Sequence, residues 1–148
     1  MEFYLVNARH SLLKPPINPK TNTQLVRSDV LSTQDLNDFE VILNEIQEAC
    51  IEAGITFESI TSESGCGQFE VTLKHRNALL AADDALLFKV ITKGVALKHK
   101  LTATFMAKPY LDQPGNGMHM HFSILDKEGQ NIFSNDGDAG SNLSLIHI

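Results

Sequence analysis

The stretch Glu63 to Leu73, ESGCGQFEVTL, joins a glycine-rich turn to a run of alternating apolar and polar side chains. A period of two is typical of a β-strand that buries one face and leaves the other polar. The preceding run, Ile55 to Thr61, alternates in the same way. Two such runs separated by a short turn containing glycine predict a hairpin, and therefore a sheet with antiparallel pairing.

Helices and further strands are predicted on both sides of this hairpin. Ser32 and Asp35 form an S-x-x-D start signal for a helix that ends at Gly54, because glycine commonly terminates helices. The other predicted elements are a strand at Glu2 to Val6, a long loop at Asn7 to Val30, a helix at Asn77 to Lys98, and strands at Thr102 to Met106 and Met118 to Ile124. This order predicts an α+β fold, mainly an antiparallel sheet with two long amphipathic helices.

The buried side of the second helix is predicted from its apolar spacing. Helical periodicity places Leu79, Ala82, Leu86, Val90 and Leu97 on one face, and we expect that face to pack on the core.

Composition excludes several classes of protein. The 148 residues, 43% of them hydrophobic, suffice for one globular domain. The net charge is −6 and no basic run is interleaved with aromatic residues, so we expect no nucleic-acid partner. No apolar run is long enough to cross a membrane, and only two cysteines are present, which favours a cytoplasmic protein without disulfides.

Two groups of polar residues are candidates for chemistry. Glu63 and Glu70 flank the glycine turn, which can bring their carboxylates together as oxygen ligands for a hard cation. In GNGMHMHFS, Gly115 to Ser123, two histidines and the serine share one face of the predicted strand. Each group alone also fits an ordinary surface, since a glutamate on a strand is most often simply solvated and a histidine pair is more often structural.

Four motifs in order resemble the catalytic domain of the glutamine synthetase family: EFYLV, ESGCGQFEV, AADDALLFKVITKGVALKHKLTATFMAKPY and PGNGMHMHFSILDKEGQNIFS. The resemblance runs from Met1 to about Asn142. Within the family, GQFEV, AADDALLFK, TFMAKP and the proline of PGNGMH are most similar to the gamma-glutamylpolyamine (gamma-glutamylputrescine) synthetases.

The resemblance implies roles for particular residues. Glu2, Glu63 and Glu70 would hold one divalent cation, and His119 would be the imidazole ligand of a second. The implied roles of the others are as follows: His121 and Ser123 would face the ATP phosphates, Glu58 would lie near the nucleotide, and Gly115 would approach glutamate through its backbone. Pro114 is a departure from the pattern, because glutamine synthetase tends to have asparagine at this position.

The implied activity is an ATP-dependent ligase with Mg²⁺ or Mn²⁺, two ions in each site. It joins the γ-carboxylate of glutamate to an amine, either a polyamine or ammonia, through a γ-glutamyl phosphate. The family builds its sites between the subunits of a homo-oligomeric ring. The alternative is a relative that binds metal or nucleotide without catalysis.

The extent of the resemblance also predicts the organisation of the chain. Residues 1–142 match a central part of the catalytic domain, without the N-terminal domain and the C-terminal half. The last six residues, LSLIHI, can be encoded by a transposon-end adapter used in sequencing libraries, so we expect 143–148 to be a non-native tail. We therefore expect the chain by itself to be inactive and only marginally stable.

Overall fold

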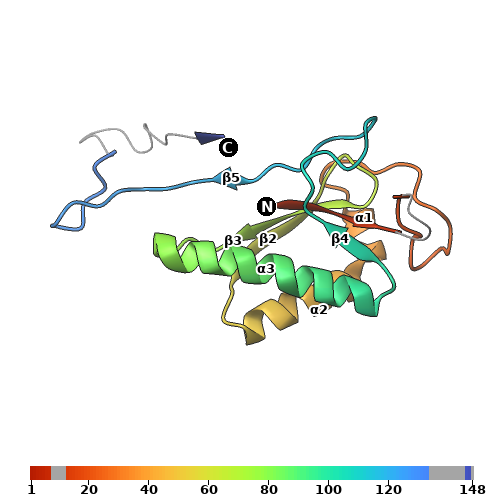
Figure 1. The fold of residues 1–148 in the computed structure, drawn as a ribbon, viewed down its shortest axis with the longest axis horizontal. Helices are drawn as coiled ribbons and strands as arrows, with labels where there is room; N and C mark the ends of the chain where they lie inside the picture. The colour runs from red at the N-terminus through yellow and green to blue at the C-terminus, as the bar shows by residue number, and fades with distance from the viewer. Residues whose placement is uncertain (8–12, 134–145, 148) are drawn as a thin grey trace. The chain divides into compact units, whose positions relative to one another are not determined.

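The computed structural model describes residues 1–7, 13–133 and 146–147, and the chain divides into two compact units, Met1–Gly117 and Met118–Ile148 (Figure 1). Within the described residues, no helix combines the length and the apolar character needed to cross a bilayer.

The first unit is built on a four-stranded antiparallel sheet with the strand order β2-β3-β1-β4. The strands are β1 (Glu2–Val6), β2 (Phe57–Ser62), β3 (Gln68–Leu73) and β4 (Thr102–Thr104). The predicted hairpin is confirmed as the β2–β3 pair, and β1 lies between β3 and β4. The central position of β1 explains why Phe3 to Val6 are all fully buried.

One face of the sheet packs against helices to form the core. Phe3 on β1 illustrates this packing, because its ring contacts those of Phe69, Phe88 and Phe105 at centroid distances of 6.2, 6.0 and 5.5 Å. Side chains on a strand alternate between faces, so the neighbours Glu2 and Tyr4 belong to the opposite face. Burial of Phe3 in the core on one face of the sheet thus places Glu2 on the opposite face.

The first predicted helix is present as two helices, α1 (Thr33–Asp38) and α2 (Glu40–Glu52). The start is as predicted, because the Ser32 hydroxyl accepts a hydrogen bond from the Asp35 N–H at 3.1 Å. The break falls at Phe39, whose backbone leaves helical geometry with φ −102° and ψ 12°. Its ring is buried against Phe69 at 5.4 Å, and its N–H donates to the Asp35 carbonyl at 3.1 Å, so α2 follows α1 directly.

The second predicted helix is α3 (Ala78–Lys98), which begins after the side-chain cap Asn77. The predicted buried face is wrong: Leu79, Leu86, Val90 and Leu97 are 72, 63, 60 and 67% exposed. The buried residues are Asp84, Phe88, Thr92, Val95 and Ala96. Because α3 carries apolar side chains on both faces, periodicity could not tell which face meets the core. The face that meets the core carries Phe88, whose ring contacts those of Phe3 and Phe105.

The second unit has little regular structure. Its strand β5 (His119–Met120) pairs antiparallel with β6 (Ile146–His147), which lies inside the segment 143–148 that is expected to be a non-native tail. The predicted strand from Met118 to Ile124 is therefore shorter than expected, because within the described residues the ladder with β6 extends over two residue pairs only. A turn follows, in which the Asp126 carboxylate accepts hydrogen bonds from the backbone of Glu128 and Gln130.

Candidate metal centre

Two carboxylates lie side by side on the polar face of the sheet. Glu2 of β1 is the direct partner of Glu70 of β3 in the antiparallel ladder. A carboxylate oxygen of each lies within 4.8 Å of one of the other, and both residues are half-buried. Like charges opposed across a ladder repel each other. A cation held between them would turn this repulsion into coordination.

The Glu2 carboxylate is held in place by two donors. Its Oε2 atom accepts hydrogen bonds from the Gly117 backbone N–H at 2.9 Å and from the Gln68 side-chain amide at 3.2 Å. The Glu2 backbone N–H donates to the Gly117 carbonyl at 3.1 Å, so the backbone of Gly117 is bound to Glu2 through both its N–H and its carbonyl. These contacts orient the carboxylate before any ligand arrives.

Gln68 joins three parts of the site, and sequence reasoning missed it. Its side chain is 1% exposed, and its amide nitrogen lies 2.9 Å from the Gly115 carbonyl and 3.1 Å from Asn116 Oδ1. Its Oε1 atom accepts a hydrogen bond from the Gly65 N–H at 3.2 Å. One signal could have found it. Gln68 lies on the polar face of the predicted strand, directly between the glycine turn and the apolar Phe69.

The segment containing Gly115 packs against Met106 and Ala107, in the segment that directly follows β4. A Cβ atom on Gly115 would lie 2.6 Å from the Ala107 carbonyl oxygen, so only glycine fits there. Asn116 adds hydrogen bonds from its backbone to the same carbonyl and from its side chain to the Met106 carbonyl. Packing by itself therefore accounts for glycine at position 115.

A positive group already lies at these carboxylates. The Met1 ammonium is 3.7 Å from Glu70 Oε1 and donates to the Val71 carbonyl at 2.7 Å. Burial lowers the pKa of the Met1 ammonium, while Glu70, Glu2 and Glu63 each raise that pKa. Glu63 is half-buried in the turn before β3, where its N–H donates to the Gln68 carbonyl. The three predicted carboxylates thus act on one cationic group, and their oxygen donors suit a hard divalent ion.

The remaining predicted residues lie elsewhere in the chain. Glu58 is exposed on β2, where its Oε1 atom is 3.9 Å from His75 Nδ1. His119, His121 and Ser123 belong to the second unit and are exposed. Their position with respect to the three carboxylates stays a prediction.

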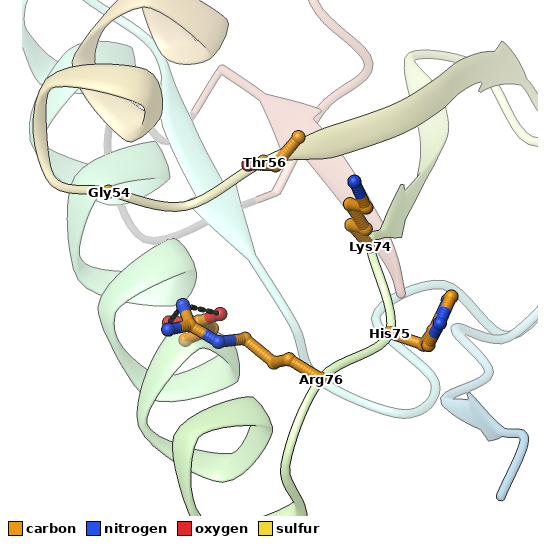
Figure 2. A pocket seen from close by; sticks show the side chains of 6 residues that line it. Gly54, Thr56, Lys74, His75 and Arg76 are labelled. Carbon is orange, nitrogen blue, oxygen red and sulfur yellow. Dashed lines mark hydrogen bonds and ion pairs between the residues drawn. The ribbon is translucent and has the colours of Figure 1, made fainter.

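A small cavity of about 280 Å³ lies between the ends of α2 and β3 and the first half of α3. It is lined by Gly54, Thr56, Lys74, His75, Arg76 and Asp84. Arg76 donates hydrogen bonds to the two carboxylate oxygens of Asp84 at 2.9 and 3.2 Å. Figure 2 shows that Lys74 and His75 point away from the Arg76 side chain. None of the predicted site residues lines this cavity, although His75 is the partner of Glu58.

These features define a class of protein: an α+β domain that gathers carboxylates on the polar face of its sheet. A family model for the catalytic domain of glutamine synthetase matches residues 1–147, and the chain belongs to this family. The predicted fold class, a partial domain of this type with a mainly antiparallel sheet, is confirmed.

Individual relatives show the same similarity. Gamma-glutamylputrescine synthetase of Escherichia coli (strain K12) is 41% identical over 138 residues, which cover 90% of this chain and 29% of the relative. Glutamate–isopropylamine ligase of a Pseudomonas species is 42% identical over 100 residues, 68% of this chain and 22% of the relative. Among solved structures, a GmaS/ADP complex superimposes with a TM-score of 0.78 at 33% identity, covering 97% of this chain and 31% of that one. The chain therefore spans less than a third of the length of these proteins.

Proposed function

We propose that the intact protein is a ligase that uses ATP to join the γ-carboxylate of glutamate to an amine. The observation that carries the proposal is the opposed pair of Glu2 and Glu70, held by fixed donors on the polar face of the sheet. Family membership supports the reaction type, because catalytic domains of this family serve glutamine synthesis.

In this proposal Glu2, Glu63 and Glu70 hold one Mg²⁺ or Mn²⁺ ion, and His119 is a ligand of a second. When bound, the metal would supply positive charge to neutralise the ATP phosphates. Gln68 and the Gly117 N–H hold the Glu2 carboxylate in a fixed orientation. The carboxylate therefore needs no rearrangement to bind a metal ion.

The other predicted residues would bind the substrates. His121 and Ser123 contact the phosphates of ATP, Glu58 lies near the nucleotide, and the Gly115 backbone approaches glutamate. The γ-phosphoryl group moves from ATP to the glutamate γ-carboxylate, and ADP leaves. The amine then attacks the γ-carbonyl carbon of the γ-glutamyl phosphate, forms the amide bond, and releases phosphate and a proton.

For the acceptor we propose a primary alkyl amine such as a polyamine, with ammonia as the competing substrate. The support is that two similar relatives are named for putrescine and for isopropylamine. Competition between putrescine, isopropylamine and ammonia in the intact enzyme tests this choice, and a preference for ammonia would contradict it.

We further propose that the intact protein works in the cytoplasm as a ring of identical subunits, and that the 148-residue chain alone is inactive. The thiols of Cys50 and Cys66 are both free, which is consistent with a reducing compartment. Release of phosphate by the purified chain that depends on both ATP and glutamate would contradict the predicted inactivity.

The test of the metal centre is a titration of the 148-residue chain with Mn²⁺, in the presence and absence of ATP, followed by calorimetry. We expect one saturable site that Glu70→Gln weakens by about tenfold or more, since a carboxylate ligand becomes a neutral amide. Glu48→Gln is the matched control, because Glu48 is exposed on α2 and is expected to leave the affinity unchanged. Equal affinity in the Glu70→Gln variant, or no binding by a folded chain, would contradict the proposed site.

A further inference from the structure

The outward face of α3 is apolar although its inward face already packs on the core. Leu79, Leu86, Val90 and Leu97 lie on one line along the helix, opposite Phe88, and each is at least 60% exposed. A helix that is apolar all round is normally buried on all sides. The helix itself is the long green helix of Figure 1, and its exposed apolar face suits contact with a partner.

The spacing of this outward face is that of a coiled-coil seam. With Asp83 and Lys93 included, the outward positions are separated alternately by four and three residues, from Leu79 to Leu97. Four of the six positions are apolar, and the two charged positions have opposite signs.

The seam is also self-complementary in the antiparallel direction. Leu79 and Leu97 lie nine residues before and after Phe88, and Leu86 and Val90 lie two residues before and after it. Two antiparallel copies of α3 related by a two-fold axis at Phe88 would therefore place leucine against leucine and Leu86 against Val90.

Charge selects between the two possible directions. Asp83 and Lys93 each lie five residues from Phe88, so an antiparallel pair brings every Asp83 against a Lys93 of the second copy. A parallel pair would instead place Asp83 against Asp83 and Lys93 against Lys93, and like charges within a contact are repulsive. The charges of the seam therefore favour the antiparallel arrangement.

Small residues beside the seam leave room for a second helix. Ala82 and Gly94 lie six residues from Phe88 on either side, so they also meet in the antiparallel pair. A Cβ atom on Gly94 would contact nothing within 4 Å, so the described residues of this chain do not require glycine there. Because glycine weakens a helix interior, close approach of another backbone is the physical reason to keep it.

We propose that a second copy of this chain covers the outward face of α3, through antiparallel packing of the two α3 helices about a two-fold axis at Phe88. The interface is isologous, so that the same surface serves in both copies. A helix of 21 residues is only about 31 Å long, which places the contact at the small end of specific interfaces. We therefore expect a dimer whose formation depends on concentration in the micromolar range.

The first experiment is sedimentation equilibrium of the 148-residue chain over a range of concentrations. The mass is expected to rise from 16.3 kDa to twice that value. Leu86→Glu places a charge in the seam and should abolish the dimer, whereas Val41→Glu should not. Val41 is the matched control because it is an apolar residue of similar exposure, 65% against 63%, on α2.

The second experiment tests the direction of packing by exchanging charges. Asp83→Lys and Lys93→Asp are each expected to weaken dimerisation by about tenfold, because each creates a like-charge contact. The double variant should restore the dissociation constant of the unmodified chain, since the opposite charges meet again. Circular dichroism checks that each variant keeps its helix content.

Three results would overturn the proposal. A monomer at every concentration would show that a second copy does not cover the outward face. Another partner, such as a further segment of a longer protein, would then cover it. A dimer that survives Leu86→Glu would use another surface. Failure of the double charge exchange to restore dimerisation would exclude the antiparallel register.

Discussion

Glu2 and Glu70 are direct partners on neighbouring antiparallel strands, and a carboxylate oxygen of each lies within 4.8 Å of one of the other. Two negative charges at such positions destabilise a sheet. The Glu2 carboxylate is compensated by donors from Gln68 and Gly117, and Glu70 by the Met1 ammonium at 3.7 Å. The sheet thus tolerates two opposed carboxylates because each has its own positive or hydrogen-bonding partner.

Binding of a cation to this pair should stabilise the fold. At a Mn²⁺ concentration about 100 times the Kd, mass action adds about 2.7 kcal/mol to the free energy of unfolding. We expect the melting temperature to rise on addition of Mn²⁺, to fall back with EDTA, and to respond weakly in Glu70→Gln. A variant that gains as much thermal stability as the unmodified chain would show that the ion binds elsewhere.

Replacement of Gln68 tests the buried hydrogen-bond network. Gln68→Leu leaves the Gly65 N–H and the Gly115 carbonyl without these partners, so we expect a loss of about 2 kcal/mol in the free energy of unfolding, measured in urea. Gln24→Leu is the control, because Gln24 is exposed and its replacement should change stability by less than about 0.5 kcal/mol. Equal effects of the two substitutions would argue against the network.

Two glycines should respond to alanine in opposite directions. A Cβ atom on Gly65 would lie 1.9 Å from the hydroxyl of Tyr4, so Gly65→Ala is expected to destabilise the chain by about 2 kcal/mol or more. Gly94→Ala has open space in the middle of α3 and should stabilise by about 0.5 to 1 kcal/mol. Urea unfolding at a concentration where the chain is monomeric measures both, and a stabilising Gly65→Ala would contradict the packing at Tyr4.

Alkaline pH should destabilise the fold through a buried thiol. Burial raises the pKa of Cys50 from 9.0 to about 11. Above the lower value the unfolded chain loses a proton that the folded chain retains, so the free energy of unfolding falls as pH rises, by up to about 2.7 kcal/mol.

The same sign applies to Tyr4 and Tyr110, because burial raises the pKa of each to about 12. Urea unfolding at about pH 8 and about pH 10.5 measures the loss, and Cys50→Ala should reduce it while costing about 2 kcal/mol at the lower pH through the cavity it leaves. Stability that stays level between these two pH values would contradict this assignment.

Local patterns were sufficient for most of the elements. The hairpin around the glycine turn, the Ser32 cap and the start of α3 at Asn77 were all predicted, because each depends on residues close together in the sequence. Two predictions failed. The first helix is divided at Phe39, and the wrong face of α3 was assigned to the core, because the choice of face depends on contacts with distant residues.

The sequence by itself determined the family, the order of the strands and helices, and the candidates Glu2, Glu63 and Glu70. Only the tertiary structure decided that Glu2 faces Glu70, that Gln68 joins Glu2 to the Gly115 segment, and that the leucines of α3 point outward. The physical reason is that strand register, buried hydrogen bonds and the choice between two apolar faces depend on contacts between residues far apart in the chain. Periodicity describes one segment at a time and carries no information about its neighbours.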